Sequence, residues 1–352
     1  MLSFFARIAS SKTYLIYEFT IQMKVAVVIL NWNGASLLEQ FLPKIIAYSS
    51  GADLYVADNA STDQSIAVLK SRFPEIKIIQ NQHNFGFAKG YNEALKHVDA
   101  DVYALVNSDI EVTPNWLEPI REAFSNEKET IILQPKILDF KNKSKFEYAG
   151  AAGGFIDSYG YPFCRGRIFE TIENDFGQYN NAIEIFWASG ACFFIRSDAF
   201  HSLNGFDVDF FAHQEEIDLC WRAFNKKMII KYIPNSVVYH IGGATLEQGS
   251  TKKTFLNFRN SLFMLTKNVP SNKLFSTLFM RMVLDGLAGV YFIIQGKPRH
   301  FLAILNAHFA FYSQFRKFYK KREPLQRKNY FKTKSVVFAY FVKSGKVFGD
   351  VI

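Results

Sequence analysis

The 352-residue sequence has little cysteine, little proline and no long uninterrupted apolar run. Its cysteines, Cys164, Cys192 and Cys220, are widely spaced and form no CxxC pair, which argues against a disulfide framework and a structural zinc site. With 49% hydrophobic and 21% charged residues, the chain can bury a large core, which excludes a disordered tail. A reducing cytosol is the simplest compartment for such a chain.

Excess positive charge is scarce outside one segment. The formal net charge is +9, and residues 316–334 hold nine Lys or Arg residues against Glu323 alone, a formal +8. The rest of the chain is therefore nearly neutral, unlike a nucleic-acid-binding domain, whose basic charge spreads over a folded face. We expect this tail to bind an anionic membrane surface, because each juxtamembrane basic residue contributes roughly 1 kcal/mol there.

Residues 1–22 lack the apolar run and the small-residue cleavage site of a signal peptide. Met23 directly precedes a strong strand pattern, so we expect the natural start at Met23 and treat residues 1–22 as an N-terminal extension. A short amphipathic membrane anchor is the alternative for this extension.

From Lys24 onwards, short apolar runs alternate with helical segments, which predicts a parallel sheet flanked by helices. The predicted strands are Val25–Leu30, Leu54–Ala57, Ile76–Ile79 and Val102–Val106. Thr113 followed by Pro114 predicts the start of a further helix, since proline is tolerated in a first turn. This half is therefore expected to be a Rossmann-like nucleotide-binding unit.

After Gly150 the sequence is richer in glycine and aromatic residues, which predicts a mixed sheet with long loops. A helix is expected at Glu215–Phe224, and a strand is expected to end at Val237–His240. These segments should cover the nucleotide-binding half.

Two apolar segments follow, Leu274–Ile294 and Phe301–Phe315, and both are interrupted by charged or polar residues. Neither reaches the roughly 20 clean apolar residues that span a bilayer, so we expect helices lying in a membrane interface. Arg281 and Asp285 should pair at i, i+4. Packing of these helices on the domain, or on a second copy in a homo-oligomer, is the alternative.

Polar residues follow three of the four predicted strands. Asn31-Trp32-Asn33-Gly34, the run 58–63 and Asn107-Ser108-Asp109 stand at these ends. Each alone is typical of turns and helix caps. In an open α/β sheet, however, ligands bind beyond the carboxyl ends of the strands, so three such ends on one edge indicate a binding site.

Six motifs occur in a familiar order: VVILNWNG, VADNASTD, NFGFAKGYN, LVNSDIEV, FFAHQEEIDLCWR and VYHIGGAT. Over residues 24 to about 260 the sequence resembles the family 2 glycosyltransferases with the GT-A fold, especially the bacterial rhamnosyltransferase-like members. The resemblance implies an α/β nucleotide-diphospho-sugar transferase domain at residues 23–255, followed by a helical, membrane-associating region at 256–352. It also implies an inverting, metal-dependent enzyme.

The resemblance implies that Asp58 accepts a hydrogen bond from the N3–H of uracil or thymine. A plain turn-forming role for Asp58, and a solvated role for Lys89, are the alternatives. The other residues implied in nucleotide-sugar binding are Leu30, Asn31, Asn33, Asn84, Lys89, Asn107 and Ser108. In the 84–92 motif, small residues at a helix start would let amide groups approach an anion.

The metal site implied by the resemblance holds Mg²⁺ or Mn²⁺ on Asp109 and His240. Asn107 replaces the first acid of the family's usual metal motif. One carboxylate, one imidazole and two diphosphate oxygens suit these cations. A lone histidine at a strand end is otherwise a structural residue.

The general base implied by the resemblance is Glu216, with Glu215 as the second candidate. These acids begin a helix, where the helix dipole favours negative charge. Asp218 is expected to be structural and to pair with Arg222. Trp187 and Gly190 are implied in the acceptor side of the site, with a buried core tryptophan as the alternative.

The predicted reaction is transfer from a UDP- or dTDP-sugar, such as dTDP-rhamnose, to a hydroxyl of a lipid-linked saccharide in cell-surface polysaccharide synthesis. The expected location is cytoplasmic, peripheral at the inner face of the cell membrane. A sugar-phosphate nucleotidyltransferase is an alternative, but the first strand lacks the basic glycine-rich loop of those enzymes. A catalytically inactive scaffold that binds sugar nucleotides is the second alternative.

Overall fold

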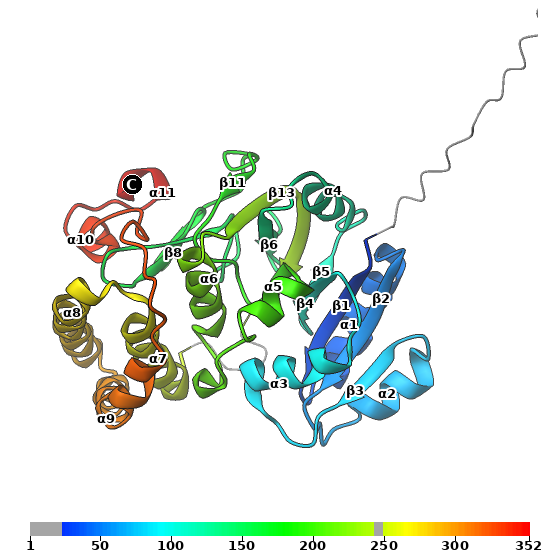
Figure 1. Ribbon diagram of the computed structural model, residues 1–352, viewed down its shortest axis with the longest axis horizontal. Coiled ribbons are helices and arrows are strands. Elements are labelled where there is room, and N and C mark those ends of the chain that lie inside the picture. Colours follow the sequence, from blue (N-terminus) through cyan, green and yellow to red (C-terminus); the bar gives the residue numbers. More distant parts are fainter. Residues whose placement is uncertain (1–22, 243–248) are drawn as a thin grey trace, which may run out of the picture.

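The computed structural model describes residues 23–242 and 249–352, and its centre is a mixed β-sheet (Figure 1). The strand order is β11-β13-β6-β12-β4-β1-β2-β3, and β5 pairs with β13. The strands are β1 (Val25–Asn31), β2 (Ala52–Asp58), β3 (Lys77–Gln80), β4 (Val102–Asn107), β5 (Ile110–Val112), β6 (Thr130–Asp139), β11 (Ile183–Glu184), β12 (Cys192–Arg196) and β13 (Ile229–His240). The expectations for residues 1–22 and for the end of the VYHIGGAT motif lie outside the described residues.

The strands β1 to β4 are parallel, and they confirm the predicted strands to within about two residues. Val25 to Ile29 are all buried, because helices cover both faces of the sheet. In the register of this half, Asn31 lies opposite Asp58, and Leu30 lies opposite Asn107. The predicted polar strand ends therefore meet at one edge.

Helices pack on both faces of the sheet. One face carries α1 (Ala35–Tyr48), α2 (Ser65–Arg72) and α4 (Glu118–Asn126). The other carries α3 (Gly86–Ala94) with η1 (Leu95–His97), α5 (Ser197–Ser202) and α6 (Glu215–Asn225).

The predicted helix start at Thr113–Pro114 is wrong, since α4 begins at Glu118. Pro114 instead opens a turn in which Asn115 adopts a left-handed conformation, φ 59°. Pro119 then occupies the first turn of the helix.

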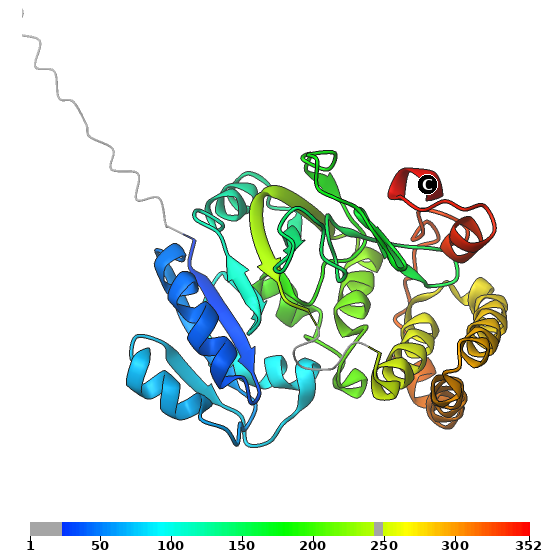
Figure 2. The ribbon, with the colours of Figure 1, turned by 180° about the vertical axis from the view of Figure 1, so that it is seen from behind.

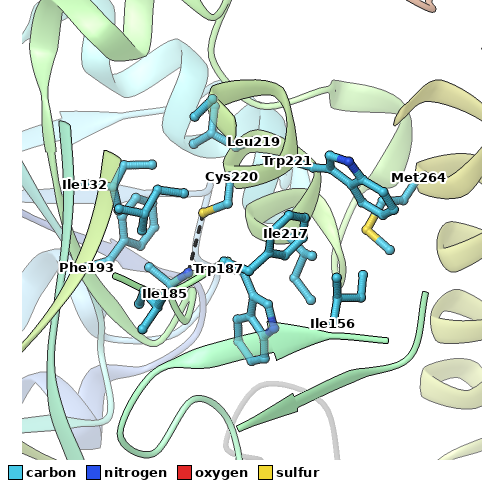
Figure 3. Packing of buried hydrophobic residues seen from close by; sticks show 14 of the residues in the cluster. Ile132, Ile156, Ile185, Trp187, Phe193, Ile217, Leu219, Cys220, Trp221 and Met264 are labelled. Atoms are coloured by element: carbon cyan, nitrogen blue, oxygen red, sulfur yellow. Dashed lines mark hydrogen bonds between the residues drawn. The ribbon is translucent and has the colours of Figure 1, made fainter. Parts of the chain in front are cut away.

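A second, small antiparallel sheet and the loops beside it cover one side of α6. Its strands are β7 (Gly154–Ile156), β8 (Pro162–Cys164), β9 (Arg167–Ile168) and β10 (Thr171–Ile172). Figure 3 shows Ile156 of this sheet, Trp187, and Ile217 and Trp221 of α6 within one apolar core. The glycine- and aromatic-rich segment therefore forms a small antiparallel sheet of its own, which differs from the predicted mixed sheet, and the later strands β11, β12 and β13 join the large sheet instead.

The C-terminal helices lie together at the end of the molecule opposite β1 to β3 (Figures 1 and 2). They are α7 (Thr251–Asn268), η3 (Ser271–Lys273), α8 (Leu274–Ile294), α9 (Pro298–Lys320), α10 (Val336–Phe341) and α11 (Phe348–Val351). The apolar segment Leu274–Ile294 is helical as predicted, and the second predicted helix extends beyond 301–315 at both ends. Helix α7 runs across the expected domain boundary at residue 255.

By length and composition alone, residues Ser271–Ile294 could cross a membrane, which corrects the expectation that their charges exclude it. In the structure these charges face the protein. Arg281 Nε donates to Asp285 Oδ1 at 2.7 Å, as predicted, and Tyr161 Oη donates to the same oxygen at 3.0 Å. Both charged side chains are buried, so the helix lies against the domain with its polar stripe inward.

Buried ion pairs join α7 to α6. Lys267 Nζ lies 2.7 Å from Asp218 Oδ2 and 2.8 Å from Asp207 Oδ2, and all three side chains are buried. Arg222 Nε also pairs with Asp218 Oδ2 at 2.9 Å, which confirms the predicted i, i+4 pair. Asp218 is therefore a structural residue that holds the C-terminal helices on α6.

Part of the basic tail is also used within the protein. Lys321 Nζ lies 2.6 Å from carboxylate oxygens of both Asp207 and Asp209, and Lys317 pairs with Asp209 at 2.7 Å. Two of the nine predicted membrane-facing cations therefore already have acidic partners.

Candidate active site

The nucleotide side of the site is built at the ends of β1 and β2. Asp58 is 1% exposed, and its Oδ1 accepts hydrogen bonds from Asn31 Nδ2 at 3.0 Å and from the Ser61 hydroxyl at 2.5 Å. Its Oδ2 accepts from the Ser61 N–H at 2.9 Å. Because a carboxylate has about four lone-pair directions, these bonds orient Asp58 and leave it one further acceptor position.

Asn31 carries an unpaired acceptor beside this carboxylate. Its side chain is fully buried, and Oδ1 has no hydrogen-bond partner in the described structure. A Cβ at Gly34 would lie only 2.5 Å from this oxygen, so the close approach of the chain here requires glycine. Buried polar atoms normally have partners, so an unsatisfied one at a strand end indicates a place where a ligand binds.

Asn33 has a different position from the one the sequence suggests. It is exposed, with φ 51°, and its Oδ1 accepts from the Thr62 N–H at 2.7 Å. Its side chain thus ties the loop after β2 to the end of β1. The half-buried Leu30 lies opposite Ala57 and Asn107 in the sheet.

The start of α3 supplies Asn84 and Lys89. Asn84 Oδ1 accepts from the Gly86 N–H at 3.0 Å, and Lys89 Nζ lies 4.0 Å from the centroid of the Phe85 ring. Among the described residues, no carboxylate lies within ion-pair distance of Lys89. Its charge is therefore held over an aromatic face and is available to an anion.

The first amides of α3 do not point at open solvent, in contrast to the sequence expectation. The Phe87 N–H donates to the Phe211 carbonyl oxygen at 2.9 Å, and the Ala88 N–H approaches the same oxygen at 3.5 Å. These N–H groups are thus already satisfied by protein. The side chain of Lys89 therefore remains the candidate of this motif for contact with an anion.

The two residues predicted to hold the metal lie together. His240 Nε2 is 3.2 Å from Asp109 Oδ1, because β13 pairs antiparallel with β5 and His240 lies opposite Ile110. Two ligands at right angles around a cation, with bonds of about 2.1 Å, are about 3 Å apart. A carboxylate oxygen and an imidazole nitrogen at this spacing fit Mg²⁺ or Mn²⁺.

In the described residues, no group of three or more His, Cys, Asp or Glu side chains surrounds one metal position. Asp109 and His240 are thus two potential ligands, a set that would suit a cation whose shell is completed by substrate phosphate oxygens. Asn107 and Ser108 are half-buried at the same strand end, and the Asn107 N–H donates to the Ala191 carbonyl oxygen at 2.9 Å.

Glu147 is a residue of this site that the sequence does not indicate. It is 3% exposed, and its Oε1 lies 3.3 Å from His240 Nδ1, on the opposite side of the ring from Asp109. A carboxylate at one imidazole nitrogen orients the ring and leaves the other nitrogen directed at a metal. Glu147 belongs to no motif, and only the folded structure brings it to His240.

The pKa values of His240 and Asp109 depend on the charges that surround them. Burial lowers the pKa of His240, but the carboxylates of Glu147 and Asp109 outweigh burial and raise its pKa to about 10. Burial raises the pKa of Asp109, but the adjacent His240 cation outweighs this and holds the pKa below its usual value. A proton on Nε2 thus occupies the position that a divalent cation can take.

The acidic residues at the start of α6 differ in exposure. Glu215 is 4% exposed, whereas Glu216 is half-buried. Glu216 lies beside Gly190, where an added Cβ would be 3.7 Å from the carboxyl carbon of Glu216. The next residue, Ala191, accepts from the Asn107 N–H, so Glu216 lies close to the strand end that precedes Asp109.

Burial raises the pKa of Glu216 to about 7, although backbone N–H groups partly oppose it. Burial and the charge of Glu216 raise the pKa of Glu215 well above its usual value. One oxygen of each carboxylate is buried without a hydrogen-bond partner, as are Gln214 Oε1 and His213 Nε2. Glu216 is half-buried with a pKa of about 7, whereas Glu215 is almost fully buried, so Glu216 fits the expectation for a general base better than Glu215 does.

The two acceptor-side candidates, Gly190 and Trp187, lie in different surroundings. Gly190 lies beside Glu216, and a Cβ there would be 3.3 Å from the Phe87 ring. Trp187 is 4% exposed, its indole N–H donates to the Phe155 carbonyl oxygen at 2.7 Å, and its ring packs against Gly154. Figure 3 shows this ring inside the core, so the structure does not bring Trp187 to the site surface.

The comparisons with known proteins bear on the family and the fold of the chain. A family model described as glycosyl transferase family 2 matches residues 26–203, about half of the chain. The chain is 24% identical over 229 residues to an N-acetylglucosaminyl-diphospho-decaprenol L-rhamnosyltransferase of Mycobacterium tuberculosis, covering 61% of this chain and 75% of that one.

Two solved structures share the fold. GalNAc-T7 with UDP, GalNAc and Mn²⁺ has a TM-score of 0.57 at 16% identity, covering 72% of this chain and about half of the other, 49%. A mannosyltransferase from Pyrobaculum calidifontis with GDP-Man and Mn²⁺ has a TM-score of 0.50 at 14% identity, covering 86% and 84%. The sheet and its helices are the GT-A fold that the sequence predicted. The chain is a glycosyltransferase and belongs to glycosyl transferase family 2.

Proposed function

We propose that this protein transfers one sugar, with inversion, from a UDP- or dTDP-sugar to an acceptor hydroxyl, assisted by Mg²⁺ or Mn²⁺. The observation that carries the proposal is the link between the metal pair and the acid pair. A Cβ added at Gly190 would lie 3.7 Å from the carboxyl carbon of Glu216, and the adjacent Ala191 carbonyl oxygen accepts from the Asn107 N–H at 2.9 Å, two residues before Asp109. These contacts support an arrangement in which a base and a cation-binding carboxylate lie near each other at the sheet edge.

In the proposed reaction, Glu216 accepts the proton of the acceptor hydroxyl as the hydroxyl oxygen bonds to the anomeric carbon. The bond from that carbon to the nucleoside diphosphate breaks, and the electron pair leaves with the phosphate oxygen. Because attack comes from the face opposite the leaving group, the anomeric configuration inverts. Gly190 lies against Glu216 and leaves room for the acceptor, because it has no side chain at this point.

Asp109 and His240 would hold the cation, and Glu147 would orient His240 through Nδ1. When bound, the cation neutralises the negative charge that builds on the departing diphosphate. Lys89 stands at the start of α3 to bind ribose or diphosphate oxygens.

The two fold neighbours hold UDP in one case and GDP-Man in the other, so the identity of the donor's base is inferred from the residues of the site. Asp58 is a fixed acceptor for an N–H group, and the unpaired Asn31 Oδ1 lies beside it. We propose that Asp58 accepts from N3–H of uracil or thymine. Asn31 and Leu30 would flank the same base.

The acceptor is proposed by analogy with the Mycobacterium tuberculosis relative, whose name specifies a rhamnosyl donor and a lipid-linked saccharide. We therefore propose dTDP-rhamnose among the donors, a polyprenyl-linked saccharide as acceptor, and a role in cell-surface polysaccharide synthesis. Such an acceptor places the enzyme at the inner face of the cell membrane. The exposed apolar faces of α8 and α9 support this location.

The test is a thermal-shift panel of UDP-, dTDP-, GDP- and CMP-sugars with and without Mn²⁺, followed by transfer assays with the donors that bind. A ligand of the folded state raises the melting temperature, so we expect stabilisation by uridine or thymidine donors that is larger with Mn²⁺. Stabilisation by GDP- or CMP-sugars alone would contradict the role of Asp58.

The catalytic part of the test compares Glu216→Gln with Glu215→Gln. Glutamine keeps the shape of the side chain but does not accept the proton, so we expect Glu216→Gln to lower transfer about 100-fold or more while donor binding persists. Glu215→Gln should retain more activity. Unchanged turnover in Glu216→Gln would remove this residue as the base, and no turnover in wild type with any bound donor would favour the scaffold alternative.

A further inference from the structure

The backbone just before the acid pair has an unusual conformation. Phe211, His213 and Gln214 all have positive φ, at 66°, 70° and 74°, although none is glycine. Side chains make this region of φ unfavourable, so such residues persist only where the surroundings hold them. Gln214 directly precedes Glu215, and its backbone therefore sets the direction in which α6 and both its carboxylates begin.

Asn260 of α7 is the side chain that holds this loop. It is fully buried, and its Nδ2 donates to the carbonyl oxygens of Phe210 at 3.0 Å, Ala212 at 2.9 Å and His213 at 2.8 Å. Its Oδ1 accepts from Arg259 Nε at 2.9 Å. Because Arg259 engages the oxygen, the amide has one orientation, with both hydrogens directed at the loop.

The other side of the loop contacts the nucleotide-binding half. The Phe211 carbonyl oxygen accepts from the Phe87 N–H at 2.9 Å, and a Cβ at Gly86 would lie 2.8 Å from the Phe211 ring. The loop is therefore fixed between α3 and α7. Figures 1 and 2 show α7 among the C-terminal helices, on the side of α6 away from β1 to β3.

We infer that Asn260 is a positioning residue for sugar transfer, which holds the 210–214 loop so that Glu216 faces the acceptor hydroxyl. This inference rests on the proposed role of Glu216. It makes α7 part of the active site, although the residues matched by the family model end at 203.

A packing role for Asn260 predicts a different outcome. If Asn260 only fastened α7, its loss would lower stability and leave the chemistry of the folded fraction unchanged. If it positions Glu216, a loosened loop lets water reach this carboxylate, which lies partly buried with a pKa near 7. The base limb of the pH profile then moves to lower pH, because hydration favours the charged carboxylate.

The experiment uses the full chain and compares Asn260→Ala with Asn257→Ala. Asn257 lies one turn earlier on α7, is half-buried, and donates no hydrogen bond to the 210–214 loop. We expect Asn260→Ala to lower kcat about 10- to 100-fold while the dissociation constant of the sugar nucleotide changes less than about threefold. The base limb of its pH profile should move to lower pH, and Asn257→Ala should match wild type.

A second variant, Asn260→Ser, retains one hydrogen that can be donated and should have an intermediate kcat. If Asn260→Ala does not fold, the same measurements are made on Asn260→Ser. A folded variant with wild-type kcat and an unchanged pH profile would overturn the inference, as would equal losses in kcat and donor binding. Glu216→Gln separates the two proposals: if that variant is inactive while Asn260→Ala is normal, only the role of Asn260 fails.

Discussion

At the scale of single residues, the site depends on carboxylates in different surroundings. Asp58 is surrounded by hydrogen-bond donors, Asp109 lies beside a cationic imidazole, and Glu216 lies in a partly dry position with few partners. These surroundings suit the three carboxylates to the different roles that we propose for them: base recognition, metal binding and proton transfer. The pKa of Glu216, raised to about 7 by burial, is close to the pH at which a general base works best.

The pH dependence of the reaction follows from this value. Glu216 must be ionised to accept a proton, so we expect kcat/KM to fall about tenfold per unit as the pH drops below about 7. The folded-state pKa lies above the ordinary value of 4.5, so the protonated form favours folding and this contribution is lost as the pH rises through 7. The rate profile of wild type, measured with a saturating donor, checks the first expectation.

The Glu216→Gln variant provides the control. At pH 8 the Glu216→Gln variant lacks the buried negative charge of Glu216, so its melting temperature should be at least that of wild type. Its low activity should not vary with pH around pH 7. A melting temperature well below wild type at pH 8 would indicate that the variant is damaged rather than deprived of a base.

At the scale of elements, the first turn of α6 carries both the proposed base Glu216 and, two residues later, Asp218 of a buried ion cluster. Lys267 of α7 lies between Asp218 and Asp207, and all three side chains are buried. Removing one partner of a buried ion pair leaves an uncompensated charge, which is far more costly than losing an exposed pair. The ion pairs that attach α7 to α6 therefore stabilise the helix that carries the proposed base.

We expect Lys267→Met to lower the free energy of unfolding by about 3 kcal/mol at neutral pH. The matched control is Lys317→Met, whose partner Asp209 lies at the surface and whose loss should cost less than about 1 kcal/mol. Urea unfolding followed by circular dichroism measures both. Equal effects of the two substitutions would show that the buried cluster contributes no more than a surface pair.

Acid should reduce the difference in the free energy of unfolding between wild type and Lys267→Met. Burial raises the pKa of Asp207, but Lys267 outweighs it and the net pKa lies below the usual 3.8. A carboxyl group with a lowered pKa stabilises the fold above its unfolded value and loses this effect as the pH falls through the folded value. The stability gap should therefore be largest above about pH 4.

The sequence predicted the parallel half well, because strands and helices alternate there with clear hydrophobic patterns. It misplaced the start of α4, since Pro114 fits a turn as well as a helix start. It could place Asp109 and His240 in one site only through family resemblance, because their contact comes from β5 pairing with β13 across a long stretch of chain. Glu147 and Asn260 went unnoticed because isolated polar residues carry no pattern.

At the scale of the whole molecule, the C-terminal helices have two opposite faces. The inward face of α8 holds the Arg281–Asp285 pair, whereas Phe279 and Ile294 on its outer face are 67% and 77% exposed. On α9, Phe309 is 70% exposed. An apolar surface of this kind, next to basic residues of the tail, is typical of a helix pair that enters a lipid interface.

We expect the protein to bind vesicles that contain phosphatidylglycerol, and to bind them less well at high salt. The double substitution Phe279→Ser and Phe309→Ser should weaken binding about tenfold or more, since each buried phenyl group contributes on the order of 1.5–3 kcal/mol. Phe176→Ser, which changes an 85% exposed residue outside α8 and α9, is the control for a vesicle co-sedimentation assay. Concentration-dependent dimers without vesicle binding would instead favour a second copy on this face.

The outermost strands of the large sheet are short: β3 spans Lys77–Gln80, and β11 spans Ile183–Glu184. An unpaired strand edge can recruit a strand from another molecule, and short, charged edges discourage this. Lys77 is exposed and already paired with Asp53, which adds a charge where such a strand would approach. Copies at high local concentration should therefore resist stacking into β-aggregates.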